Sequence, residues 1–106
     1  MTQIKTHREI DAAAKLIADW RSMMIVHVIY EQGPLRYGNI ASQLELSPTI
    51  LSEKLSQLTK VGLLLRNKND GSKEVIYEAS KYAKDMVDAY HLLEKVNDSL
   101  RIEEDE

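Results

Sequence analysis

The 106-residue sequence contains no cysteine. Disulfide bridges, thiol-based redox sensing, zinc sites built on cysteine and cysteine nucleophiles are therefore excluded. No apolar run approaches the roughly 18 residues that a membrane span requires, and the first residues lack the apolar core of a signal peptide. We therefore expect no contact with a membrane and a cytoplasmic location.

Groups that perform catalysis are also few and dispersed. The histidines, His7, His27 and His91, are scattered along the sequence, and no set of histidines or carboxylates has the spacing of metal ligands. His27 lies in an apolar helical segment, where a hydrogen-bonded core histidine is expected and a pH- or metal-responsive role is the alternative. Gly33 and Gly38 do not form a phosphate-binding loop. The sequence predicts a protein that is not an enzyme, with no cofactor and no metal.

Charge is unevenly distributed along what composition predicts to be one soluble domain. Hydrophobic residues make up 43% and charged residues 29% of the chain, as in globular proteins. The net charge is −3, and the acidic segment 103–106 contributes −4 of it. Between Gly33 and Lys84, eight basic and five acidic residues give +3 (8 − 5). This mild positive bias of the middle of the chain favours an anionic partner, though only weakly.

The most informative segment runs from Leu46 to Gly62. Ser47 suits the N-cap of a helix, Pro48 suits its first position and Gly62 suits its end. Leucines at spacings of four and three predict one buried stripe: Leu51, Leu55 and Leu58. The opposite face carries groups that bond base edges or phosphates: Thr49, Ser52, Glu53, Ser56, Gln57 and Lys60. An ordinary surface helix also has one apolar and one polar face. The neighbouring segments must therefore decide whether this helix contacts DNA or is simply a surface helix.

Those neighbours indicate a winged helix-turn-helix. A short helical pattern, from about Arg36 to Leu44, precedes the segment and follows the Gly33-Pro34 breaker. Strands are predicted at 63–66 and 74–78, on either side of the turn residues 69–72. Two short helices joined by a tight turn and followed by a hairpin are typical of DNA-binding proteins. Lys68 and Lys73 belong to the hairpin tip, where a wing meets phosphates.

Both ends of the chain are predicted to be helical. Residues 8–31 form one helix or two, with a break near Asp19 in the second case. A last helix begins at Ser80, its expected cap, and carries two apolar stripes. One stripe contains Ala83, Val87 and Tyr90, and the other repeats nearly every heptad at Tyr82, Met86, Ala89, Leu93, Val96 and Leu100. Because a small domain buries only one such stripe, we expect the other to form a dimer contact; a single wide core stripe is the alternative.

From Trp20 to Tyr77 the sequence resembles the HxlR family of winged-helix transcriptional regulators. The matching positions are Trp20, Gly33-Pro34, Arg36-Tyr37, Ser47, Leu51, Leu55, Leu58, Gly62-Leu63, Arg66, Tyr77 and Ser80. Single elements of this pattern recur in other winged-helix families such as the MarR relatives. The resemblance implies a homodimeric DNA-binding regulator, in which the terminal helices form the dimer and the second helix of the motif enters the major groove. The sequence departs from the family by lacking its N-terminal sensing cysteine and by having Ala83 in place of a glycine.

The resemblance assigns roles to individual residues. Those implied to contact base edges or the groove are Pro48, Thr49, Ser52, Glu53 and Gln57. Those implied to contact phosphate are Arg36, Ser47, Lys54, Lys60, Lys68 and Lys73, of which Lys54 lies at the edge of the buried stripe. Those expected at the dimer interface are Ile10, Ala14, Tyr82, Met86, Ala89, Leu93 and Val96.

The predicted architecture is mainly α-helical with a small β-hairpin wing. One domain covers residues 1–102, with dimerisation helices at about 8–31 and 80–100, a DNA-binding part at about 34–79 and an acidic tail at 103–106. The expected partners are double-stranded DNA, read as an inverted repeat, and a second copy of the chain. Two alternatives stay open. The winged helix could be a protein–protein adaptor, or it could respond to a small-molecule effector of unknown identity in a pocket lined by Met23, Met24 and Tyr90.

Overall fold

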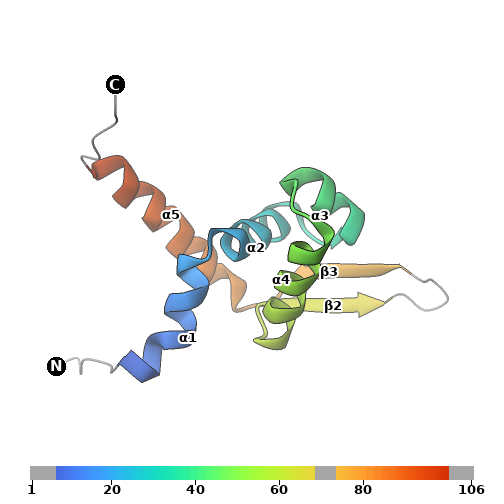
Figure 1. Cartoon of the computed structure of the whole chain (residues 1–106), viewed down its shortest axis with the longest axis horizontal. Coiled ribbons are helices and arrows are strands. Elements are labelled where there is room, and N and C mark those ends of the chain that lie inside the picture. Colours follow the sequence, from blue (N-terminus) through green and yellow to red (C-terminus); the bar gives the residue numbers. More distant parts are fainter. Residues whose placement is uncertain (1–6, 69–73, 101–106) are drawn as a thin grey trace.

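The computed structural model describes residues 7–68 and 74–100, with side chains from residue 11 onward. The elements are α1 (His7–Ala18), α2 (Trp20–Gln32), β1 (Leu35–Arg36), α3 (Tyr37–Leu44), α4 (Pro48–Lys60), β2 (Leu64–Lys68), β3 (Val75–Ala79) and α5 (Ala83–Ser99). Figure 1 shows α1 and α5 at one end of the elongated molecule and α3, α4 and the β2–β3 hairpin at the other, with α2 between them. The predicted class, mainly helical with a small wing, is confirmed.

The core lies where α2 meets α4, α5 and the sheet. Leu51, Leu55 and Leu58 are at most 1% exposed, as their spacing predicts. On α2 the inaccessible side chains are Ser22, Met23, Ile25, Val26 and Ile29. Helix α4 is therefore packed against the rest of the molecule through its leucine face.

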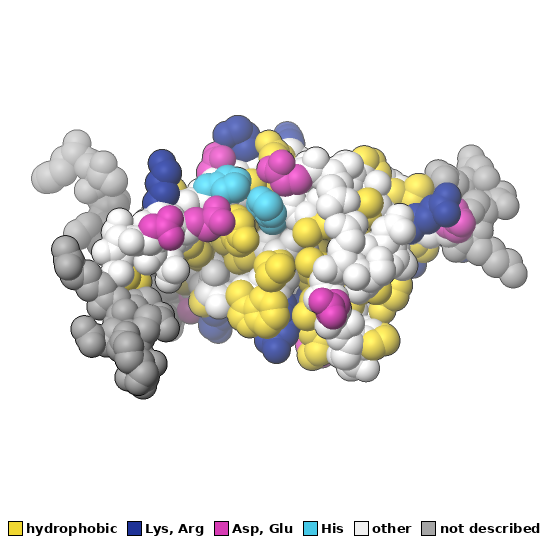
Figure 2. Space-filling model, turned by 90° about the horizontal axis from the view of Figure 1, so that it is seen from above, with side chains coloured by type: hydrophobic (Ala, Val, Ile, Leu, Met, Phe, Trp, Pro, Cys, Tyr) yellow, Lys and Arg dark blue, Asp and Glu magenta, His cyan; other side chains and the backbone are white. Residues whose placement is uncertain are grey.

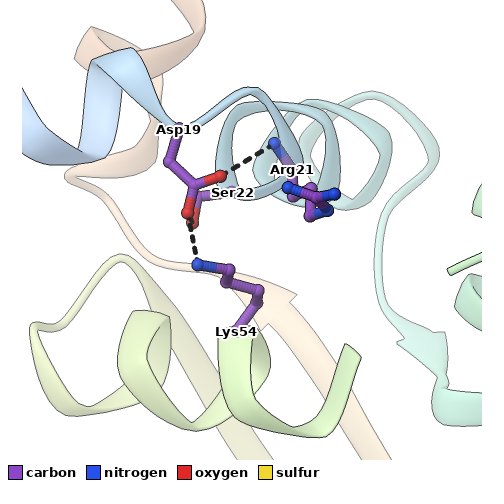
Figure 3. Close-up of polar contacts among 4 residues, drawn as sticks. All are labelled: Asp19, Arg21, Ser22 and Lys54. Atoms are coloured by element: carbon purple, nitrogen blue, oxygen red, sulfur yellow. Dashed lines mark hydrogen bonds and ion pairs between the residues drawn. The ribbon is translucent and has the colours of Figure 1, made fainter. Parts of the chain in front are cut away.

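The sequence left open whether residues 8–31 form one helix or two; the structure has two, α1 and α2, with a break at Asp19. Asp19 is the N-cap of α2, because its carboxylate accepts hydrogen bonds from the Arg21 amide and the Ser22 hydroxyl, both at 3.1 Å. The same carboxylate forms an ion pair with Lys54 of α4, with Oδ2 and Nζ 2.5 Å apart. Figure 3 shows the three side chains of Asp19, Ser22 and Lys54 converging between the two helices. One carboxylate thus starts α2 and connects it to α4.

This environment lowers the pKa of Asp19 below its ordinary value of 3.8. Partial burial by itself raises the pKa, but hydrogen bonds from Lys54, Ser22 and the Arg21 amide, together with the Lys54 charge, outweigh it. Because folding lowers this pKa, the unfolded chain takes up the proton first on acidification. The ionised carboxylate therefore stabilises the fold fully above the ordinary carboxyl range, and this contribution is lost as the pH falls through the lower, folded-state pKa.

We expect Asp19→Asn to lower the free energy of unfolding by about 1–2 kcal/mol at neutral pH, since asparagine keeps the cap but leaves Lys54 unpaired. The difference from the wild type should shrink as the pH falls below about 4, where the wild-type carboxylate also becomes neutral. Urea denaturation at several pH values measures this. Asp88→Asn, which removes the exposed Lys84–Asp88 pair, is the control and should change little. An Asp19→Asn deficit that does not depend on pH would show that the charge is not the cause.

The sheet has three strands rather than the predicted two. Its order is β1-β3-β2, and the additional strand β1 pairs antiparallel with β3 through Leu35 opposite Tyr77 and Arg36 opposite Ile76. As a result, α3 begins at Tyr37, directly after a strand. The start of α3 is therefore held to the wing by backbone pairing.

The last helix begins at Ala83 and not at Ser80. The Ser80 hydroxyl donates to the Gly62 carbonyl at 2.5 Å and accepts from the Tyr82 amide at 3.2 Å, so it stabilises a turn before the helix. Gly62 has a positive φ of 89°, and the amides of Gly62 and Leu63 bond back to Thr59 and Leu58. This pattern is the Schellman motif that ends a helix at a glycine, so the predicted stop of α4 is confirmed.

Candidate nucleic-acid interface

The outward face of α4 is open to solvent. Ser47 caps the helix by accepting a hydrogen bond from the Ile50 amide at 3.2 Å, and Pro48 is its first residue, both as predicted. The exposed side chains of this face include the predicted contact residues Thr49, Ser52, Glu53, Gln57 and Lys60. A helix that is buried on one side and polar and exposed on the other is suited to enter a groove.

The start of α4 is held by a contact that sequence analysis did not find. The Tyr37 hydroxyl of α3 donates to the Pro48 carbonyl at 3.3 Å and lies 3.3 Å from the Ser52 hydroxyl. In the sequence, Tyr37 belonged to the apolar face of the short helix and to the family pattern, and neither indicated this contact. Glu45, which ends α3, adopts a left-handed conformation (φ 54°) that turns the chain toward α4. These features fix the angle between the two helices of the motif.

Two of the residues predicted to contact phosphate, Lys54 and Arg36, are paired with carboxylates of the protein. Lys54 is 18% exposed and is paired with Asp19, so it connects α4 to α2 rather than facing outward. Its position at the edge of the buried stripe explains this correction. Arg36 is exposed but pairs with Glu74 at 3.0 Å. Exposed pairs of this kind contribute little to stability.

The strand register separates Arg36 from Lys68. Residues directly opposite one another in neighbouring strands project from the same face of a sheet, and successive residues alternate. Arg36 is opposite Ile76, while Lys68 is opposite Val75 on the other side of β3, so the two basic side chains leave opposite faces. Lys68 shares its face with the buried Leu64, hence with the side on which the helices pack. Lys68 is therefore on the α4 side, whereas Arg36 is not. Lys73 lies outside the described residues.

The other end of the molecule carries an apolar groove between α1, α2 and α5. Its volume is about 470 Å³, and its walls include Trp20, Met24, Tyr90, Leu93, Val96 and Leu100. Several of these side chains are unusually exposed for their type, with Trp20 at 55%, Leu93 at 44% and Val96 at 53%. The groove thus contains two of the residues predicted at the dimer interface. It also contains Met23, Met24 and Tyr90, which were expected in the core, with an effector pocket as the alternative; Met23 is in fact a core residue, 3% exposed.

The other residues predicted at the dimer interface lie in different environments, some in the core and some at the surface. Met86 is 7% exposed and packs in the core of its own subunit, because the two stripes of α5 are adjacent and Met86 falls on the inner one. Ala89 is half-buried, and Ala14 is exposed. Tyr82, 60% exposed, lines a second apolar hollow beside α1. The side chain of Ile10 lies outside the described residues.

Across the part of the chain that the structure describes, every helix is too short or too polar to cross a bilayer.

The three-stranded sheet, the capped and exposed α4, and the short α3 before it define a winged helix-turn-helix protein. The model of the MarR family matches residues 19–75, more than half of the chain. The chain therefore belongs to the MarR family of winged-helix transcriptional regulators. No curated protein sequence matches the chain.

Solved structures show the same fold. The reduced form of the transcriptional regulator YodB from B. subtilis superimposes with a TM-score of 0.81 at 19% sequence identity, over 95% of this chain and 100% of that one. HlyU from Vibrio cholerae gives a TM-score of 0.69 at 28% identity, over 86% and 97%. The transcriptional regulator HlyU from Vibrio vulnificus gives 0.63 at 27% identity, over 82% and 93%.

Proposed function

We propose that the protein is a DNA-binding transcriptional regulator that reads an inverted-repeat operator as a homodimer, with α4 in the major groove. The observation that carries this proposal is the one-sided burial of α4. Its leucine face is inaccessible, while the polar face that follows the Ser47 cap is exposed. Membership of the MarR family supports the regulatory role. The similarity to the two HlyU structures, at 27% and 28% identity, is consistent with it.

The exposed side chains of α4 have the chemistry to read bases. Hydroxyls and amides donate to and accept from base edges, so Thr49, Ser52 and Gln57 are the proposed direct contacts. Glu53 accepts from the amino group of cytosine, and Pro48 offers an apolar surface to a thymine methyl. The Tyr37 contact orients Ser52 and the first turn of the helix before DNA arrives.

Phosphate contacts surround this face. Lys60 at the end of α4 and Lys68 at the end of β2 are exposed, and the positive N-terminal end of α4 at Ser47 favours an anion. Lys73 stays in the proposed set. Arg36 is left out of it, because it is paired with Glu74 and projects from the face of the sheet away from α4. If three lysines act in each of two subunits, the logarithm of the affinity should fall with the logarithm of the salt concentration with a slope of roughly −5 (0.9 × 6).

A dimer places two copies of α4 on one operator. The occupant that we propose for the groove is the terminal-helix region of a second copy, because Trp20, Leu93 and Val96 are exposed together along one apolar groove, and grouped exposed apolar side chains mark interaction sites. A two-fold dimer binds half-sites about 34–36 Å apart, one helical turn of DNA. A small-molecule effector would occupy the same groove and would compete with this packing.

We expect Thr49→Ala to weaken binding to the operator by about 1–3 kcal/mol, and to weaken binding to random DNA much less, because the hydroxyl reads a base. Lys68→Ala should instead weaken binding to both DNAs about equally and make the salt slope shallower by about two for the dimer, because it contacts phosphate. Titrations of both DNAs at several salt concentrations distinguish the two roles.

Lys95→Ala on α5 removes the same charge from an exposed site away from α4 and is the control. It should leave affinity and salt slope unchanged. Equal losses on both DNAs would remove Thr49 from the base-reading set. If no DNA is bound at all while the protein stays folded and dimeric, the adaptor function is the better account of the fold.

The narrower family assignment and the location are also proposals. The ordered positions from Trp20 to Tyr77 support the proposal that the protein is an HxlR-type regulator within the MarR-like proteins. A regulator that binds chromosomal DNA would act in the cytoplasm, as the sequence predicts.

A further inference from the structure

Two of the three scattered histidines meet on one face of the molecule. His27 and Glu31 are one helical turn apart on α2, and His91 comes from α5, which packs against α2. One ligand atom of each of these residues lies within 4.8 Å of the other two. Figure 2 shows histidine side chains gathered with acidic side chains on the upper face, beside hydrophobic ones. The sequence concealed this cluster because the ligands come from opposite ends of the chain.

A second interaction orients one of the rings. His91 Nδ1 lies 2.9 Å from Glu94 Oε1, so Nε2 is the ring nitrogen of His91 that can serve as a metal ligand. Histidines that bind metals usually donate their second ring N–H to a carboxylate in this way. The His27 ring packs on Tyr90 with centroids 4.5 Å apart and lies 5.3 Å from the His91 ring. The half-buried His27 ring is therefore held against α5, and the exposed His91 ring is oriented by Glu94 and by its contact with His27.

We propose that His27, Glu31 and His91 bind a divalent transition-metal ion, with Zn²⁺ as the first choice. Two imidazoles and one carboxylate are a donor set that zinc accepts, and three protein ligands leave a fourth position for water. In a tetrahedral site with bonds of about 2.1 Å the donor atoms are about 3.4 Å apart. The ligand atoms lie within 4.8 Å of one another, so side-chain rotation has to bring them closer by up to about 1.4 Å for zinc to bind all three.

An ordinary surface cluster explains these residues less well. Within residues 7–68 and 74–100, no hydrogen bond or ion pair involves the side chain of His27 or Glu31, although His27 is half-buried. A bound cation supplies a partner to both groups at once. It would also crosslink α2, which supports the motif, to α5, which carries the groove. The site does not depend on DNA binding, so either proposal can fail without the other.

The test is a zinc titration of the full-length protein against a chromogenic chelator, with Co²⁺ absorption to report coordination. We expect one metal per chain. His27→Gln, Glu31→Gln and His91→Gln each remove a ligand, and should each weaken binding by more than the roughly 10–100-fold that losing a supporting residue costs. Glu94→Ala removes such a supporting residue and should lie within that range. His7→Gln, which changes the remaining histidine, is the matched control and should bind like the wild type.

Thermal unfolding gives an independent readout, since an ion that binds only the folded state raises the melting temperature. Zinc should raise it for the wild type and for His7→Gln, but not for His91→Gln. Circular dichroism of the metal-free variants shows that they are folded. Zinc binding that survives both His27→Gln and His91→Gln, or that is lost in His7→Gln, would overturn the proposal, as would the absence of binding by the wild type.

Discussion

Replacing Leu93 by glutamate is expected to convert the protein from a dimer to a monomer and to weaken operator binding at least about 100-fold. Leu93 lies in the apolar groove of α5 and is 44% exposed in the single subunit. A carboxylate buried at the centre of an interface costs about 2–4 kcal/mol or more, and such central positions dominate association. Under the proposed binding mode each subunit reads one half-site, so a monomer would also lose the second half of the operator contact.

Sedimentation and operator titration measure the two effects together. Leu92→Glu is a close control, because Leu92 is next in sequence, is 60% exposed and does not line the groove. It should remain dimeric and bind DNA as the wild type does. If Leu93→Glu remains dimeric, the groove is not the interface and is free to accept an effector. If the wild type is itself a monomer at working concentration, the proposed binding mode is wrong.

Replacing Leu55 by alanine is expected to lower the free energy of unfolding by about 2–5 kcal/mol. Leu55 is 1% exposed in the middle of the buried stripe of α4, so its loss leaves a cavity beneath the helix. This is a large fraction of the roughly 5–15 kcal/mol by which domains of this size are stable. Urea denaturation measures the change, and Ser56→Ala on the exposed side should stay within about 0.5 kcal/mol of the wild type.

The two substitutions test which face of α4 supports the fold. A large loss from Ser56→Ala together with a small loss from Leu55→Ala would mean that α4 is rotated relative to the structure described. In that case its polar residues would face the core, and the proposed base contacts would be impossible.

The sequence predicted α4 accurately because its signals are local. Ser47, Pro48 and Gly62 mark its ends, and the leucine spacing marks its buried face. Strand β1 could not be found in this way, since two residues carry no periodicity and the strand exists only because Leu35 pairs with Tyr77 far along the chain. Ser80 was expected to cap a helix because it has the right residue type; the structure shows that a longer-range bond to Gly62 prevails.

The same difference between local signals and long-range contacts applies to the candidate sites. Residues of the proposed DNA-binding face were predicted from their own helix, whereas the contacts that hold that helix, Asp19 with Lys54 and Tyr37 with Ser52, join separate elements. Met86 was placed on the outer stripe of α5 because a heptad pattern does not say which of two adjacent stripes faces inward. The cluster of His27 and His91 exists only once α2 packs against α5. Such contacts depend on packing, which a single sequence does not specify.

The most direct test of the central proposal is the selection of bound DNA from a random pool by the purified protein. We predict an enriched inverted repeat whose half-site centres are about 10–10.5 base pairs apart, or a multiple of that spacing. The same selection with Thr49→Ala should relax the preference at one position in each half-site. A pool that stays random after repeated selection with folded protein would contradict the proposal that α4 reads DNA.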